Sequence, residues 1–454
     1  MTLKKDIQMN FAFGFMQMNL DPNHEFCILA NRIDWDKITD ELSSYYSKIG
    51  RKSKSIRMMV GLHIVKHLRN LSDERVVQEL QENLYVRYLC GVGEDVTDIG
   101  KARVIDSTTM TKFRNRIGEE GMKAIERVIN SQLLKEKRID VKTQIVDTTA
   151  MEKNITYPTN GKLLMKGRTR LVRKLKKLQE LGVDVSYRSY DRLAKKSFMQ
   201  LMKLGKGRAQ RTHDNTKKLI KYAKEVVKAA TNAITINKKR CNEQDAKQIS
   251  RIKESLSNDT RLINKIINQS ELYLEKQPCK GKILSLHEPH VVVIAKGKRA
   301  KRYEFGCKVS LSMDKNGFIL GHREYDNNIA DVNTLGDVIN DWRKTFGDYP
   351  VKLAADRGYQ TNNVCYEQTM IKEVSIPTRG KKRHADADKR YFRELQKQRN
   401  CIEPVIGHLK SDHRMNICRY SGSSGDKINV SLATLAWNCK KWVRDIQKDE
   451  LKAA

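Results

Sequence analysis

The sequence has no long hydrophobic run. Its longest apolar runs, such as residues 291–295, fall far short of the roughly 20 residues that a membrane-spanning helix needs. The apolar stretch of residues 11–18 is broken by Gln17 and has no small-residue cleavage pattern behind it, so it does not resemble a secretory signal. We therefore expect a cytoplasmic protein without a membrane partner.

The few cysteines and aromatic residues exclude further classes of protein. The nine cysteines are odd in number and scattered from Cys27 to Cys439 without a C-x2-C pair, which fits neither a disulfide framework nor a zinc site. We expect them to be reduced and mostly buried. Aromatic residues make up 7% of the chain, and no aromatic-rich motif of the common RNA-binding modules is present, so an RNA-binding protein has little support.

Acidic residues are scarce relative to basic ones. The chain has 88 Lys and Arg against 54 Asp and Glu, a formal net charge of +34. Such an excess repels itself in the compact state and indicates a polyanionic partner, either nucleic acid or an anionic membrane surface. Residues 161–270 hold 29 Lys and Arg against 9 Asp and Glu, so +20 of this charge lies in one segment.

One helix in this basic segment is well defined. An apolar stripe that includes Leu219, Ala223 and Val226 recurs at helical spacing. Another face carries Lys217, Lys221, Lys224 and Lys228. Such stripes are usually solvated faces, but the density of charge here favours contact with DNA phosphate groups, without readout of base sequence.

Residues 1–140 are predicted to be helical. Amphipathic stretches cover residues 34–46 and 55–68, Ser72 is a predicted N-cap, and further helices are expected from Ser107 or Thr108 and over about residues 119–135. The helix that starts near Ser107 carries Lys112, Arg114 and Arg116. This pattern suits a DNA-end binding domain of short helices, and it suits a plain helical bundle with a solvated basic face equally well.

The pattern becomes β-type at residues 143–149 and again from residue 290. Strands are expected over residues 290–295, 303–313, 318–325, 351–355 and 374–376, with a hairpin turn at Asn316-Gly317. Helices are expected over residues 331–345, from about 362, over 388–410 and over 428–446. The sequence thus predicts an α/β fold in residues 141–454, with a mixed sheet flanked by helices. An all-α domain precedes it, and a basic helical insertion over residues 161–275 follows its first strand.

Two aspartates lie where a charged side chain is costly unless it is paired or binds a metal. Asp147 lies inside the strand predicted over residues 143–149, and Asp356 ends the strand predicted over residues 351–355. Arg357 follows directly in a turn, where it could contact DNA beside the acid. Each aspartate alone is weak evidence, because many aspartates at strand ends only cap turns.

A third acid, Glu403, lies between two basic residues. Arg399 precedes it by four positions and Lys410 follows it by seven, so at about 100° per residue the three share one helix face. Pro404 would kink this helix or force a new start directly after the glutamate. On spacing alone, an exposed Arg399–Glu403 ion pair worth a few tenths of a kcal/mol explains the pattern more simply.

Together the three acids can form a metal site. Two Asp and one Glu can hold two Mg²⁺ ions roughly 4 Å apart, as in-line phosphoryl transfer requires, and oxygen ligands favour Mg²⁺ or Mn²⁺ over zinc. The histidines offer no competing site. His287 and His290 have the wrong spacing for a helical pair, and His408 and His413 lie five residues apart.

Three segments around these acids carry a family resemblance: VDTTAMEKN at Asp147, AADRGYQTN at Asp356 and RNCIEPVIGHLKSDHRM at Glu403. They resemble the DDE transposases of bacterial insertion sequences, whose catalytic domain has the ribonuclease-H-like fold. The last segment matches the family's R-x3-E-x6-K signature. Residues 33–91 resemble the helical amino-terminal domain of these transposases, and SLATLAWNCKKW resembles their closing helix, so the likeness covers nearly the whole chain.

The resemblance implies a role for each signature residue. Asp147, Asp356 and Glu403 would coordinate two Mg²⁺ ions, with Mn²⁺ as an alternative, and Arg399 and Lys410 would contact DNA phosphate near the cleaved end. The fuller signature has a tyrosine three residues before the arginine, whereas this chain has Gln396, so an aromatic contact with DNA is not expected there. The insertion also departs from the family, since its usual position is between the late strand and the glutamate helix.

The function implied by the resemblance is transposition. Such an enzyme binds the terminal inverted repeats of its element in double-stranded DNA, cleaves there and joins the 3′-OH ends to target DNA. Because two ends must be paired before joining, we expect a homodimer or a larger assembly. Two alternatives stay open: a structure-selective nuclease on the same fold, and a non-catalytic DNA-binding protein descended from a transposase.

Overall fold

The structure is a computed structural model that describes residues 19–47, 49–92, 105–203, 209–236, 242–295, 302–360, 370–380 and 384–453. The chain divides into two compact units: a main unit, Met1–Lys153 with Ile294–Ala454, and an inserted unit, Asn154–Val293. The inserted unit begins earlier and ends later than the predicted insertion over residues 161–275. The helix expected from about residue 362 lies outside the described residues. Among the described helices, none has both the length and the apolar character needed to cross a membrane.

The amino-terminal part of the main unit is helical. Its helices are α2 (Glu25–Arg32), α3 (Trp35–Ser43), α4 (Ile56–Leu68), α5 (Asp73–Glu82), α6 (Leu84–Leu89) and α7 (Ser107–Lys135). Helices begin close to the starts predicted at residues 34, 55, 72 and 107, whereas α2 and α6 were not predicted as separate helices. Side-chain oxygens of Asp34, Ser55 and Ser72 accept hydrogen bonds from backbone N–H groups in the first turns of α3, α4 and α5. Gly118, with φ of 59°, divides α7 into the two predicted helices.

These helices share a hydrophobic core with the carboxy-terminal helix α15 (Gly422–Ala453). Helices α4 and α7 pack against α15. As predicted, the buried side chains of α15 include Leu432, Leu435, Ala436, Cys439 and Trp442. The indole Nε1 of Trp442 donates a hydrogen bond to the Glu136 carboxylate at 2.9 Å. The helices before residue 140 therefore belong to the same compact body as the end of the chain, without a domain boundary at that residue.

A mixed sheet occupies the rest of the main unit. Its described strands are β1 (Thr143–Lys153), β2 (Val292–Ala295), β3 (Tyr303–Met313), β4 (Ile319–Tyr325), β5 (Lys352–Ala355), β6 (Glu373–Ser375) and β7 (Ile417–Cys418). The order is β2-β3-β1-β5-β6, with β4 beside β3 and β7 beside β1. The central strand β1 runs antiparallel to β3 and parallel to β5. The predicted hairpin is confirmed: β3 and β4 are joined through Gly317, whose φ is 89°.

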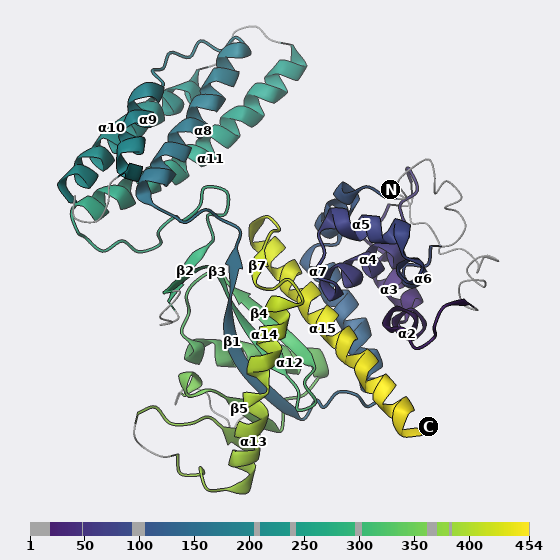
Figure 1. The fold of residues 1–454 in the computed structure, drawn as a ribbon. Helices are drawn as coiled ribbons and strands as arrows, with labels where there is room; N and C mark the ends of the chain where they lie inside the picture. Colours follow the sequence, from purple (N-terminus) through teal and green to yellow (C-terminus); the bar gives the residue numbers. More distant parts are fainter. Residues whose placement is uncertain are drawn as a thin grey trace. The chain divides into compact units, whose positions relative to one another are not determined.

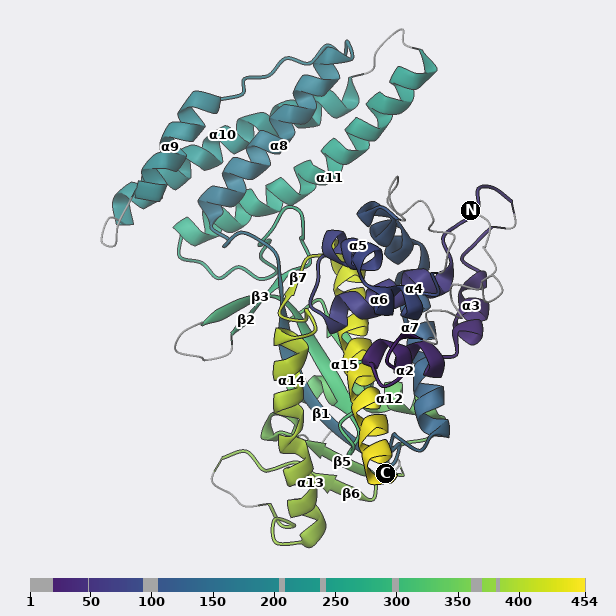
Figure 2. The ribbon, with the colours of Figure 1, turned by 45° about the vertical axis from the view of Figure 1, so that its right-hand side comes forward.

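Helices cover both faces of this sheet (Figures 1 and 2). On one face, α12 (Leu335–Phe346) packs with Val146 of β1. On the other face, α13 (Arg390–Asn400) and α14 (Ile402–Ser411) supply Leu395 and Ile402, which pack with Ile145. Neighbouring residues of β1 thus pack into the hydrophobic clusters on opposite faces of the sheet, because side chains alternate along a strand.

The inserted unit is a bundle of helices (Figure 1). Its helices are α8 (Asn160–Glu180), α9 (Asp191–Lys203), α10 (Ala209–Thr235) and α11 (Glu243–Leu274). The apolar stripe predicted for α10 is buried at Leu219, Ala223 and Val226. In the interior, the buried Asp259 accepts from Arg170 at 2.7 Å and from Lys174 at 2.5 Å. The bundle therefore has a core of its own.

Candidate active site

The sheet directs Asp147 and Asp356 to the same face. Side chains two residues apart on a strand share a face, so Asp147 lies on the side of Ile145. Asp356 directly follows β5 and is two residues beyond Ala354, which packs in the same cluster as Ile145. Strands β1 and β5 are parallel neighbours, with Val146 opposite Ala355. The two aspartates therefore lie at adjacent strand positions under α13 and α14.

Glu403 reaches this face from the start of α14. The helix predicted over residues 388–410 is two helices, since α13 ends at Asn400 and α14 begins at Ile402. Pro404 lies in the first turn of α14. Backbone N–H groups in a first turn make no hydrogen bond within the helix, so the missing N–H of proline costs nothing there. The helix break thus occurs at Cys401, before Glu403 and not directly after it as expected, and it lets Arg399, in the last turn of α13, contact this glutamate directly.

The guanidinium of Arg399 lies between the three carboxylates. Its Nη1 donates to Oε1 of Glu403 at 2.7 Å. Its Nη2 lies 3.3 Å from Oδ2 of Asp147 and 3.8 Å from Oδ2 of Asp356. The Arg399 side chain is 12% exposed. Three acids that are distant in the sequence therefore converge on one cation, which is more than the exposed ion pair that spacing alone explains.

Asp147 is the most buried of the three acids. Its side chain is 15% exposed, against 48% for Asp356 and 62% for Glu403. Desolvation raises the pKa of Asp147 to about 6. The Arg399 charge and a hydrogen bond from the Thr148 N–H oppose this shift in pKa, whereas Asp356 and Glu403 add to it. The site therefore holds a carboxylate that is ionised at neutral pH and takes up a proton in mild acid.

Residues that sequence reasoning missed hold the strand next to Asp147. Thr148 Oγ1 donates to Oδ1 of Asp331 at 2.6 Å, and Lys308 Nζ lies 2.5 Å from the same oxygen. Asp331 begins the 3-10 turn η2 (Asp331–Thr334), so the sequence marks it only as a helix start. Its partners come from β1 and β3, and no local pattern signals such a contact.

Gln396 occupies the position of the signature tyrosine. Its amide Nε2 donates to the backbone oxygen of Ser375 at 2.9 Å and to the Ser375 hydroxyl at 3.0 Å. These bonds tie α13 to β6. The side chain therefore supports the packing of the helix that carries Arg399, and it supplies no aromatic surface for DNA.

The chemistry of the three acids suits a hard divalent cation. All three offer carboxylate oxygens, the ligands that Mg²⁺ and Mn²⁺ prefer, and a cationic group already lies between them. Within the described ranges, no three His, Cys, Asp or Glu side chains are close enough together to surround a metal ion as they stand. Because Arg399 lies between the acids, metal binding requires its guanidinium to move.

The basic residues predicted on α7 differ in their surroundings. Lys112 is exposed. The Arg116 guanidinium lies over the Tyr46 ring, 4.7 Å from its centroid.

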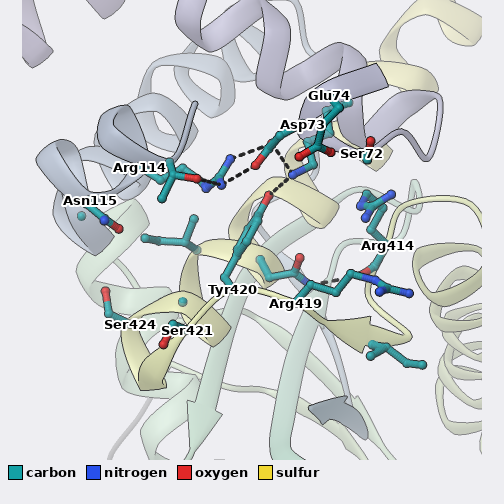
Figure 3. Close-up of a pocket in the computed structure, with 17 residues that line it drawn as sticks. Ser72, Asp73, Glu74, Arg114, Asn115, Arg414, Arg419, Tyr420, Ser421 and Ser424 are labelled. Atoms are coloured by element: carbon teal, nitrogen blue, oxygen red, sulfur yellow. Dashed lines mark hydrogen bonds and ion pairs between the residues drawn. The ribbon is translucent and has the colours of Figure 1, made fainter. Parts of the chain in front are cut away.

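Arg114 does not meet the expectation of a DNA contact, because it is only 5% exposed. Its guanidinium donates two hydrogen bonds to Asp73, at 2.9 and 2.7 Å, and it lies 4.2 Å from the Tyr420 ring centroid (Figure 3). The spacing of basic residues along α7 could not reveal this pair, since Asp73 comes from α5.

We expect the Arg114–Asp73 pair to contribute strongly to stability. Replacing Arg114 by alanine removes both of its hydrogen bonds to the half-buried Asp73, which keeps Lys66 as its remaining partner, and should lower the free energy of unfolding by about 1–3 kcal/mol. Lys112→Ala, an exposed substitution on the same helix, should change it by no more than about 0.5 kcal/mol. Urea denaturation of both variants measures the difference. Equal effects would mean that the buried pair adds no stability.

The other predicted DNA contacts are placed as follows. Arg357 is exposed beside Asp356. Lys410 is half-buried in the last turn of α14, seven residues from Glu403 and hence on the same helix face.

On α10, all four predicted lysines are exposed. Lys224 differs from the others in pairing with Glu271 of α11 at 2.5 Å. The ion pair leaves Lys217, Lys221 and Lys228 as the better candidates on this helix for contact with DNA.

Comparison with known proteins identifies the family. Residues 15–116 match the family described as "Transposase domain (DUF772)", and residues 281–439 match "Transposase DDE domain". A protein of Rhizobium meliloti named "Uncharacterized protein ORF8 in nfe locus" is 33% identical over 183 residues, which are 39% of this chain and 84% of that protein. The chain belongs to the insertion-sequence DDE transposases. The family implies a ribonuclease-H-like fold for the mixed sheet of this transposase and DNA as its partner.

The two family matches cover the candidate site in part. The DDE match includes Asp356, Arg399, Glu403 and Lys410, whereas Asp147 lies before it. Neither match covers residues 117–280, which hold β1 and most of the inserted unit. In this transposase, the case for Asp147 therefore rests on its contact with the same guanidinium that pairs with Glu403.

Proposed function

We propose that this transposase cleaves DNA at the terminal inverted repeats of its element and joins the freed 3′-OH ends to target DNA, using divalent metal ions. The observation that carries the proposal is the convergence of Asp147, Asp356 and Glu403 on the Arg399 guanidinium. Phosphoryl transfer needs positive charge beside the attacking and leaving oxygens, and clustered carboxylates are the protein groups that hold such charge.

In this proposal each residue has one role. Asp147, Asp356 and Glu403 hold two Mg²⁺ or Mn²⁺ ions, which when bound activate the attacking water or hydroxyl and stabilise the leaving 3′ oxygen. Arg399, Lys410 and Arg357 contact phosphates at the cleaved end. Joining requires two DNA ends to be held together, so we propose a dimer or a larger assembly on DNA.

The pKa of Asp147 predicts how metal binding depends on pH. A metal ligand must be deprotonated, so affinity for Mn²⁺ should be flat above about pH 7 and fall by about tenfold per pH unit below the raised pKa of about 6. Isothermal titration with Mn²⁺ at several pH values measures this dependence. A midpoint near pH 4, as for an ordinary aspartate, would show that burial of Asp147 does not control metal binding.

The exposed lysines of α10 are proposed to contact DNA phosphates. A triple variant, Lys217→Gln with Lys221→Gln and Lys228→Gln, tests this. The negative slope of log affinity against log salt should become shallower by about 0.9 for each phosphate that these lysines neutralise in the wild type. The matched control replaces Lys176 and Lys247, which pair with Glu180 and Glu243 on their own helices. If the control changes the slope as much per lysine, diffuse charge and not the α10 face attracts DNA.

One assay separates transposition from its alternatives. The protein is incubated with DNA that carries the terminal repeat, a target plasmid and Mg²⁺. Only a transposase yields strand-transfer product, while a nuclease cuts without joining, and a non-catalytic DNA-binding protein does neither. Cleavage without joining, with both DNAs bound, would overturn the proposal.

A further inference from the structure

A pocket lies apart from the candidate active site within the main unit. Its volume is about 550 Å³. One wall comes from α4, α5 and α7, and the other from β7 and the start of α15 (Figure 3). Asp147, Asp356 and Glu403 do not line it. The proposed cleavage chemistry therefore leaves this pocket without a role.

The floor of the pocket carries more positive than negative charge. Lys66 and Arg114 are 2% and 5% exposed, and both pair with the single carboxylate of Asp73, at 2.6 and 2.7 Å. Both cations also lie against the Tyr420 ring, at 4.7 and 4.2 Å from its centroid. Two buried cations thus share one anion, which leaves the floor with an uncompensated positive charge.

The pKa of Lys66 is lowered in these surroundings. Burial lowers it to about 8, with the Arg114 charge acting in the same direction and Asp73 opposing. An anion in the pocket would compensate the remaining charge, since attraction between opposite charges is strong where water is excluded.

Two arginines extend the positive surface to the rim. Arg414 and Arg419 line the pocket, and neither pairs with a carboxylate among the described residues. Arg414 adopts a left-handed backbone conformation with φ of 66°, and its Nη1 donates to the backbone oxygen of Asn70, a neutral partner, at 3.0 Å. Glu74 is the other acid in the lining, so four basic side chains stand against two acidic ones.

The remaining rim is polar and suits a tetrahedral anion. Thr111, Asn115, Ser421 and Ser424 line it with hydroxyl and amide groups. Hydroxyls, amides and arginine side chains are the groups that proteins commonly direct at phosphate oxygens. The lining therefore offers charge and hydrogen-bond donors to the same ligand.

We propose that this pocket seats a backbone phosphate of bound DNA, held by Arg414 and Arg419 over the Lys66–Arg114 floor. The proposal rests on the proposed function, because that function makes DNA the polyanion that this chain handles. It adds a fixed DNA contact between the amino-terminal helices and the carboxy-terminal helix, without readout of base sequence. Phosphate contacts fix the position of a protein on the duplex.

The test uses rim variants of the full chain, because floor variants would disturb folding. Binding to terminal-repeat duplex is measured in EDTA over a range of salt. The double variant Arg414→Gln, Arg419→Gln should make the negative slope of log affinity against log salt shallower by about 1, as expected when the protein neutralises one phosphate fewer. Arg75→Gln is the matched control, since Arg75 is outside the pocket and pairs with Glu79 on its own helix. Arg419→Gln alone, at an exposed position, gives a second measurement should the double variant fold poorly.

Inorganic phosphate serves as an independent probe. It should raise the Tm of the wild type and of the Arg75 control but not of the double variant. If the salt slopes are unchanged and the Tm of all three proteins responds equally to phosphate, the proposal that this pocket binds a phosphate is wrong, and the proposed function is unaffected. Conversely, a wild type without strand transfer but with the expected slopes would overturn the proposed function and support the pocket.

Discussion

Asp147→Asn and Glu403→Gln are each expected to reduce DNA cleavage by at least about 10²–10³-fold, the effect of removing one preorganised electrostatic group. Both substitutions keep the shape of the side chain and remove its charge, so a metal ligand is lost with little change in packing. Affinity for end DNA, measured in EDTA, should be nearly unchanged. Cleavage of a labelled terminal-repeat duplex in Mg²⁺ measures the loss.

Glu394→Gln is the matched control for these variants. Glu394 is an exposed acid of α13 that pairs with Arg390 on its own helix and does not contact Arg399. Its replacement should leave the cleavage rate unchanged. If Asp147→Asn still cuts donor DNA at the wild-type rate, the assignment of the active site is wrong.

Arg399→Gln should change stability and metal affinity in opposite directions. Without the guanidinium, Asp147, Asp356 and Glu403 repel one another, so we expect the metal-free protein to lose about 1–3 kcal/mol of unfolding free energy. Metal binding no longer has to displace a cation, so Mn²⁺ should bind about tenfold more tightly, which corresponds to about 1.4 kcal/mol of relieved repulsion. Denaturation without metal and Mn²⁺ titration provide the two measurements.

The outcome distinguishes two roles for Arg399. If the arginine competes with metal, the glutamine variant binds Mn²⁺ more tightly and regains stability when Mn²⁺ is added. If the arginine only positions the acids, the variant binds Mn²⁺ more weakly than the wild type. Arg399→Lys keeps one positive charge but cannot bridge three carboxylates, so it should fall between the wild type and Arg399→Gln in both measurements.

Much of the fold could be predicted because its local signals are strong. The hairpin around Gly317 and the cap at Ser72 depend on residues close in sequence, and each occurs as predicted. The helices expected to begin near Asp34 and Ser55 do so, and both residues cap them. Helix α2 was not predicted, because residues 26–30 are all buried and so show no helical periodicity. The core that the first helices share with α15 could not be predicted either. The spacing of apolar residues shows which face of a helix is buried, but not which other element covers that face.

The candidate site could be predicted only in part, for a related reason. Asp147 and Asp356 are marked by their places in and at the end of a strand, and Glu403 by its spacing from Arg399 and Lys410, so the residues could be named from the sequence. Their meeting point could not, because it depends on the pairing of β1 with β5 and on the break at Cys401. The same limit explains the burial of Arg114, whose partner Asp73 comes from another helix, and Asp331, whose contacts come from two strands.

The position of the inserted unit has a consequence for folding kinetics. Residues 152 and 306 are direct partners of the antiparallel β1–β3 pair, although the whole inserted unit lies between them in the chain. Pairing such distant residues costs loop-closure entropy before contacts compensate it, which slows folding. A helical bundle that folds from its own local contacts replaces most of this loop with a compact body. We therefore expect β1, the strand that carries Asp147, to pair with β3 faster once the helices of the inserted unit have folded. These helices contribute no residue to the candidate active site.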